Sequence, residues 1–181
     1  MENSFTKESS NTLFFILYLK FCYNTAMQKI TIYTDGAARG NPGPSGFGAM
    51  ISIGERVTEL GGYGGDQGTN NQMELSAPIH ALKFLKENNI TGEVKIHSDS
   101  KYVINGVNSW ILNWVKNGWK TANKKPVLNR ELWMELHELN QHFKPVWHYV
   151  AGHSGHKEND RVDEIATSFA DKIKIELKKD I

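Results

Sequence analysis

Cysteine is nearly absent from this sequence, since Cys22 is the only one among 181 residues. A single thiol cannot form a disulfide within the chain, and no Cys/His spacing of the zinc-binding kind is present. These absences exclude a disulfide-stapled secreted domain and a structural zinc module. We therefore expect a reducing, cytoplasmic setting.

An excess of charge of either sign is also lacking. The chain has 21 Lys and Arg against 20 Asp and Glu, which gives a formal net charge of +1 at pH 7. The overall charge gives no sign of a polyanionic partner. Any nucleic-acid surface must come from local clusters of lysine and arginine.

The apolar run from Leu13 to Tyr23 is too short to span a bilayer and is interrupted by Lys20. The polar start before it carries both charge signs, whereas a signal peptide has a basic start and a small-residue cleavage site. We expect no membrane association, with residues 1–26 as an extension outside the fold and residues 27–181 as the functional domain. Secretion or anchoring stays open as the alternative.

The remaining sequence predicts one domain, because 39% hydrophobic and 10% aromatic residues can form one sizeable core. Strand-like patterns cover Lys29 to Thr34, Ala49 to Ile53 and Arg56 to Tyr63. The dense Gly, Asn and Pro residues of Gly36 to Gly48 predict a loop between the first two. Short links between successive strands favour an antiparallel meander.

Helical spacing follows from Met73 to Leu85, with Thr69, Asn70 or Asn71 as possible N-cap residues. Pro78 lies within this pattern and cannot donate a hydrogen bond to the carbonyl of Glu74. The sequence therefore predicts a bend beside Glu74.

Strands and helices alternate in the second half of the chain. The expected segments are a strand at Glu93 to His97, short helices within Lys101 to Asn117, a helix at Asn129 to Phe143, a strand at Pro145 to Val150 and a closing helix from about Asp160. Such alternation predicts parallel pairing through helical crossovers. Together with the meander it predicts an α/β fold with a mixed sheet.

Four acidic residues stand where this fold could bring them together. Asp35 and Asp99 end predicted strands, Glu74 lies in a first helical turn, and Asp163 lies near another helix start. Functional groups gather at the carboxyl ends of strands in open α/β sheets. Taken singly, each acid could instead cap a helix or line a turn.

Five sequence blocks surround these acids: TDGAARGNPGPSGFGA, TNNQMEL, SDSKYV, WKTANKKPV and GHSGHKENDRVDEIA. In this order they resemble type 1 ribonuclease H of the bacterial kind, over about residues 28–170. The resemblance implies a ribonuclease H-like five-stranded mixed sheet flanked by helices. It also implies an endonuclease that hydrolyses the RNA strand of RNA–DNA hybrids.

The catalytic residues that the resemblance implies are Asp35, Glu74, Asp99, Asp163 and the loop histidine His153. The four carboxylates would hold two Mg²⁺ ions, with Mn²⁺ as a substitute, because hard cations prefer carboxylate oxygen. A metal-assisted in-line attack by water would leave 5′-phosphate and 3′-hydroxyl ends. His153 would move protons or help products leave.

Substrate contacts are implied at further positions. Asn41, Asn70 and Asn71 would reach the minor groove of the hybrid, although helix capping is an alternative for the last two. Thr69 and Asn113 would hold a DNA phosphate, and Lys101 stands where the family commonly has a substrate-reading glutamine. The segment from Trp110 to Lys125 resembles the family's basic protrusion, which offers Trp114, Lys116, Lys120, Lys124 and Lys125 to the substrate.

Two other functions are compatible with parts of the pattern. A catalytically silent hybrid binder is disfavoured by the intact set of carboxylates. A related nuclease acting on another nucleic acid is disfavoured by the basic protrusion and by the pair Asn70 and Asn71. The expected partner is an RNA–DNA hybrid, with no obligate protein partner and a monomeric state.

Overall fold

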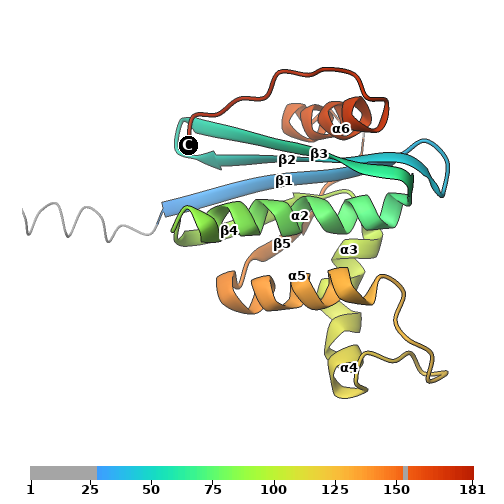
Figure 1. The fold of residues 1–181 in the computed structure, drawn as a ribbon. Coiled ribbons are helices and arrows are strands. Elements are labelled where there is room, and N and C mark those ends of the chain that lie inside the picture. The colour runs from blue at the N-terminus through green and yellow to red at the C-terminus, as the bar shows by residue number, and fades with distance from the viewer. Residues whose placement is uncertain (1–27, 153–154) are drawn as a thin grey trace, which may run out of the picture.

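The computed structural model describes residues 28–152 and 155–181, so the expected extension at residues 1–26 lies outside the described part (Figure 1). The elements in chain order are β1 (Gln28–Ala38), β2 (Gly43–Ile53), β3 (Arg56–Gly68), α2 (Asn70–Glu87), β4 (Gly92–Ser98), α3 (Lys101–Asn105), the π-helix η1 (Gly106–Trp110), α4 (Ile111–Lys116), α5 (Arg130–Phe143), β5 (Val146–Tyr149) and α6 (Lys157–Ala170).

The five strands form one mixed sheet in the order β3-β2-β1-β4-β5. β1 pairs with β2, and β2 with β3, in antiparallel fashion. β4 pairs in parallel with β1 on one side and with β5 on the other. The predicted mixed α/β sheet, a meander joined to parallel strands, is therefore confirmed.

Helices cover both faces of the sheet (Figure 1). α2 lies on one face with α5 beyond it, and the main core fills this side with fully buried residues such as Ile32, Leu82, Ile96 and Trp133. α6 lies on the opposite face, mainly against β2 and β1. It comes close because Gly48 has no side chain, and a Cβ there would clash with backbone atoms of α6.

The loop predicted over Gly36 to Gly48 is wrong in extent. β1 continues to Ala38 and β2 begins at Gly43, with Asp35 opposite Gly48 in the antiparallel register. Glycine disfavours strands in isolation, but here pairing with β1 and close packing under α6 outweigh that preference. The true connection is only the short turn between Ala38 and Gly43.

Of the three possible N-cap residues of the first long helix, Thr69 is confirmed, whereas the predicted start of the closing helix is wrong. Thr69 is the N-cap of α2, since its side chain accepts a hydrogen bond from the Gln72 amide and the Gln72 side chain accepts one from the Thr69 amide. α2 then runs without interruption through Pro78. α6 begins at Lys157 rather than at Asp160, so Asp163 lies inside the helix and not near its start.

The chain after α6 returns along the outer edge of β3 (Figure 1). Residues Lys172–Ile181, here called the C-terminal strap, form an antiparallel bridge between Lys179 and Thr58. The amide of Glu59 donates to the carbonyl of Lys178, at 2.9 Å. No helix in the described ranges is long and apolar enough to cross a membrane.

Candidate metal centre

The four acidic residues come from four separate elements. Asp35 lies within β1, Glu74 in α2, Asp99 directly after β4 and Asp163 in α6, and each is half-buried. β1 and β4 are parallel neighbours whose register pairs Thr34 with Ser98. The next residue after each of these is an aspartate, so Asp35 within β1 and Asp99 directly after β4 lie side by side.

Two glycines allow close backbone contact at this point. A Cβ on Gly36 would clash with the amide nitrogen of Glu74, so β1 touches α2 where the two acids lie. A Cβ on Gly152 would lie 2.8 Å from Oδ2 of Asp99. A larger side chain at Gly36 would push β1 and α2 apart, whereas one at Gly152 would displace the carboxylate of Asp99.

Hydrogen bonds fix the orientation of Glu74. Ser100 Oγ donates to Oε2 of Glu74 at 2.6 Å, and Asn70 Nδ2 donates to Oε1 at 2.8 Å. The same Ser100 hydroxyl caps α3 by accepting from the Val103 amide at 3.2 Å. Glu74 is thus tied to the segment that carries Asp99.

Asn159 links α6 to the same centre. Its Nδ2 lies 3.5 Å from Oδ2 of Asp99, at the long limit of a hydrogen bond. The residue is buried, and its Oδ1 has no hydrogen-bond partner among the described residues. Because residues four apart share one face of a helix, Asn159 and Asp163 point to the same side of α6.

Burial and neighbouring carboxylates raise the pKa of two of the acids, Asp35 and Glu74. Burial raises the pKa of Asp35 to about 8, helped by the negative charges of Asp99, Asp163 and Glu74, although the Gly36 amide donates to it at 2.7 Å. Burial also raises the pKa of Glu74, with a further contribution from Asp99. A bound cation would relieve this repulsion, which is the arrangement that a cation site needs.

Among the described residues, no group of three or more His, Cys, Asp and Glu side chains is placed so that it could hold a metal ion. Mg²⁺ in proteins is commonly bound by one or two carboxylates, because it keeps several waters and completes its coordination with substrate phosphate oxygen. The donors here are carboxylate oxygens, which suit Mg²⁺ or Mn²⁺ better than zinc. The residues present therefore fit a hard divalent cation in an open site.

The predicted groove-reading residues lie around one end of this site. Asn70 is bonded to Glu74, Asn71 is half-buried in the first turn of α2, and Thr69 is the cap of that helix. Asn41 is exposed in the turn between β1 and β2. Lys101 lies at the start of α3 with its Nζ 5.9 Å from the ring centre of Tyr149.

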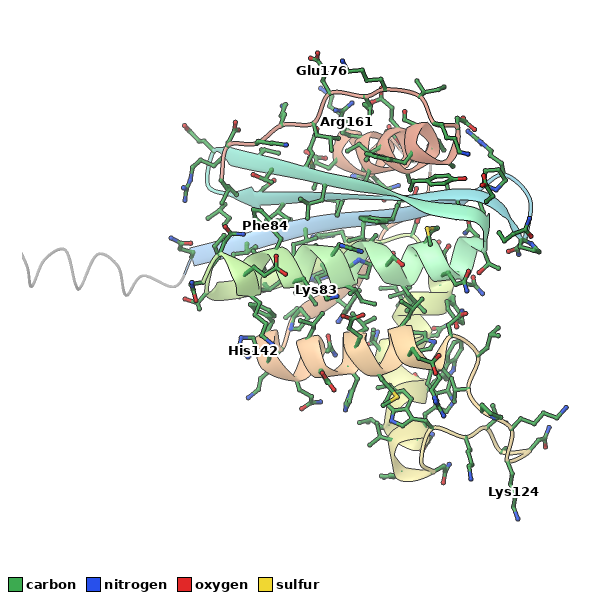
Figure 2. The ribbon with its side chains drawn as sticks, in the orientation of Figure 1. Lys83, Phe84, Lys124, His142, Arg161 and Glu176 are labelled. Atoms are coloured by element: carbon green, nitrogen blue, oxygen red, sulfur yellow. The ribbon has the colours of Figure 1, made fainter. Side chains whose placement is uncertain are left out.

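The predicted basic protrusion is formed by α4 and the loop that follows it. Its exposed residues include Asn113, Lys116, Lys120, Lys124 and Lys125. Lys124 lies at the far end of this loop, away from the sheet (Figure 2). The carboxylates and the protrusion are thus separate parts of the molecule.

Trp114, the tryptophan expected to contact the substrate, is less exposed than Trp110. Trp114 is only partly exposed and packs edge-on against the buried Trp133, with ring centres 5.3 Å apart. Trp110 is the more open of the two, at 36% exposure, although it contacts Trp114 and Tyr102. His153 lies outside the described residues.

Two residues of the site were not singled out from the sequence. Ser100 follows a strand-ending aspartate and begins a helix, so its capping role has a sequence signal, whereas its bond to Glu74 has none. Asn159 had no signal, because its partner Asp99 is distant in the chain.

Comparisons with known proteins agree with this geometry. The sequence model of the RNase H family matches residues 27–171. The "Ribonuclease H" of Ruthia magnifica subsp. Calyptogena magnifica is 51% identical over 147 residues, which covers 81% of this chain and 99% of that protein.

Two solved structures have a similar fold. The crystal structure of LC9-RNase H1, a type 1 RNase H, matches with a TM-score of 0.73 at 23% identity, over 82% of this chain and 74% of that chain. The crystal structure of LC11-RNase H1 in complex with RNA/DNA hybrid matches with a TM-score of 0.57 at 27% identity, over 79% and 97%.

Proposed function

The chain belongs to the ribonuclease H family, and from that premise we propose that it is an endonuclease that hydrolyses the RNA strand of RNA–DNA hybrids. The similar LC11-RNase H1, whose crystal structure contains an RNA/DNA hybrid, supports this choice of substrate. The observation that carries the proposal is the placement of the acids: the register of β1 and β4 sets Asp35 beside Asp99, and Ser100, the residue after Asp99, bonds to Glu74.

In this proposal Asp35, Glu74, Asp99 and Asp163 hold two Mg²⁺ ions, for which Mn²⁺ can substitute. Bound Mg²⁺ supplies activation of the attacking water and stabilisation of the leaving 3′-oxygen. The water oxygen bonds to phosphorus as the bond from phosphorus to the 3′-oxygen breaks. The products carry a 5′-phosphate and a 3′-hydroxyl.

The chain's own residues orient this reaction. Ser100 and Asn70 hold both oxygens of Glu74, and Asn159 approaches Asp99. Such partners fix the direction in which a carboxylate presents its lone pairs. His153 is proposed to transfer a proton or to help the products leave, since imidazole titrates near neutral pH.

Substrate recognition is proposed to use groups on both sides of the site. The amides of Asn41, Asn70 and Asn71 would read the minor groove, where the 2′-hydroxyls of the RNA strand are displayed. Backbone and phosphate contacts are assigned to Thr69, Lys101, Asn113, Trp114, Lys116, Lys120, Lys124 and Lys125.

We further propose that residues 27–181 form the catalytic domain, with residues 1–26 as an extension to it. The protein would act as a monomer in the cytoplasm, without an obligate protein partner. The measured mass in solution, by light scattering, tests the oligomeric state.

Cleavage of a labelled RNA–DNA hybrid with and without Mg²⁺ tests the function. We expect Mg²⁺-dependent cleavage of the RNA strand alone, and none by Asp35→Asn. Double-stranded RNA and double-stranded DNA of the same sequence serve as comparison substrates. Binding of the hybrid without cleavage would support the silent binder instead, and faster cleavage of a comparison substrate would support a different nuclease.

A further inference from the structure

An ion pair between a buried carboxylate and a partly exposed arginine joins β3 to α6. Glu59 is 2% exposed, and both of its oxygens accept hydrogen bonds from Arg161, at 2.9 and 2.8 Å. A bidentate guanidinium–carboxylate pair fixes direction as well as distance. Arg161 leaves α6 on the side that carries Glu176, above the sheet in Figure 2.

The C-terminal strap closes over this pair. The amide of Lys178 donates to Oε2 of Glu59 at 3.0 Å, and Arg161 donates to the carbonyl of Glu176 at 2.8 Å. Both members of the pair are therefore bonded to the strap as well as to each other. The residues from Lys172 onward lie beyond residues 27–171, the part that the family model matches.

The position of α6 along the sheet is also fixed at the C-terminal end of the helix, where Arg39 donates to both oxygens of Asp171, each at 2.6 Å. Gly46, Gly48 and Gly61 face α6, and a Cβ on any of them would meet it. Glycines allow close approach, but they offer no side chains that interlock with a helix. Glu59, Arg161 and the strap residues bonded to them are here called the clamp. Its hydrogen bonds can fix the position of α6 along the helix axis.

The position of α6 matters at the carboxylate site. Arg161 lies between Asn159 and Asp163 in the sequence of this helix, and Asn159 approaches Asp99 across the site. A helix transmits a shift along its axis to every residue it carries, because its hydrogen-bonded backbone is stiff. A displacement at Arg161 would therefore move Asp163 by a similar amount.

We propose that Glu59 and Arg161, held under the C-terminal strap, are positioning residues that set the place of α6 and thereby of Asp163 at the metal site. The inference rests on the proposed function for the role of Asp163, though not for the geometry of the clamp. Neither residue touches the substrate in this scheme.

Two substitutions separate position from charge. Arg161→Lys keeps a positive charge near Asp163 but loses the two-pronged contact, and Glu59→Gln keeps the shape but loses the ion pair. Glu164→Gln is the matched control, because it removes the exposed third partner of Arg161 and leaves the clamp intact.

We expect both clamp variants to need about tenfold more Mg²⁺ for half-maximal cleavage, with KM for the hybrid unchanged. The control should behave as the unaltered protein.

Two measurements without nucleic acid complete the test. Calorimetric titration with Mg²⁺ should show the same weakening of about tenfold in the clamp variants. Hydrogen exchange should show faster exchange in α6, residues 157–170. Should either variant unfold at the assay temperature, Glu59→Asp, which keeps the charge and shortens the side chain, replaces it.

A lower unfolding temperature with unchanged Mg²⁺ titration and unchanged Mg²⁺ dependence of cleavage would overturn the proposal, because the clamp would then be merely structural. If the unaltered protein fails to cleave the hybrid, the proposed function fails. Mg²⁺ titration and hydrogen exchange would still decide whether the clamp positions α6.

Discussion

Asp35 has a carboxyl pKa of about 8 instead of 3.8, because it is half-buried and lies near other carboxylates. The folded protein therefore holds this proton more tightly than the unfolded chain does. The stability that this group contributes is fully present below about pH 3.8 and is lost as the pH rises toward about 8. Without metal, Asp35 destabilises the fold at neutral pH.

Replacing Asp35 by asparagine should therefore stabilise the metal-free protein while abolishing cleavage. In EDTA we expect the unfolding temperature of Asp35→Asn to exceed that of the unaltered protein, by a margin that grows between pH 4 and pH 8. Calorimetric unfolding at several pH values measures this margin. Glu55→Gln, in the exposed turn after β2, is the control and should show no such trend; a margin independent of pH would contradict the assigned pKa.

Single residues differ in how far the sequence could predict them. The proximity of Asp35 and Asp99 could be predicted, because each stands at the end of a predicted strand and parallel neighbouring strands align their carboxyl ends. Ser100 and Asn159 could not be assigned, because their partners are 26 and 60 residues away in the chain. Such contacts depend on tertiary packing, which no local pattern encodes.

At the scale of elements, β1, β2 and α6 depart most from the sequence prediction. The Gly-rich stretch predicted a loop, yet Gly46 and Gly48 belong to β2 because α6 packs directly on them. Local propensity could not reveal a helix that lies more than a hundred residues later in the chain. The strand and helix types elsewhere were predictable from periodicity, with errors mainly at their ends.

Gly48→Ala tests this packing. The new Cβ would clash with the Val162 carbonyl, so we expect a loss of about 1–3 kcal/mol in unfolding free energy. Urea denaturation measures the loss. Gly54→Asn is the control, since Gly54 lies in an open turn at φ +62, a conformation that asparagine tolerates. Equal stability of the two variants would show that α6 can move away without cost.

The basic protrusion is a second element with its own prediction. Replacing Lys116, Lys120, Lys124 and Lys125 by glutamine should weaken hybrid binding. It should also make the slope of log affinity against log salt concentration shallower, by roughly 0.9 for each phosphate that a lysine no longer neutralises. Fluorescence anisotropy across a salt series measures this dependence. The control is a variant with the same charge change elsewhere, at Lys29, Lys86, Lys144 and Lys174. An unchanged slope in the first variant would remove the protrusion from the binding surface.

At the scale of the whole molecule, metal binding and folding should be linked. A cation that binds only the folded state stabilises it, and its ligands must lose their protons first. We expect Mg²⁺ to raise the unfolding temperature more at pH 8 than at pH 6, because the pKa of Asp35 is about 8. Thermal scans with and without Mg²⁺ at both pH values measure the difference. The Asp35→Asn variant should show a smaller difference between the two pH values. An equal rise in unfolding temperature at both pH values in the unaltered protein would count against Asp35 as a ligand.

The four carboxylates come from β1, α2, the segment after β4 and α6, so they span most of the described chain. No stretch that ends before α6 contains all of them. During refolding, binding of Mg²⁺ and hydrolysis should therefore appear only once α6 has packed against the sheet.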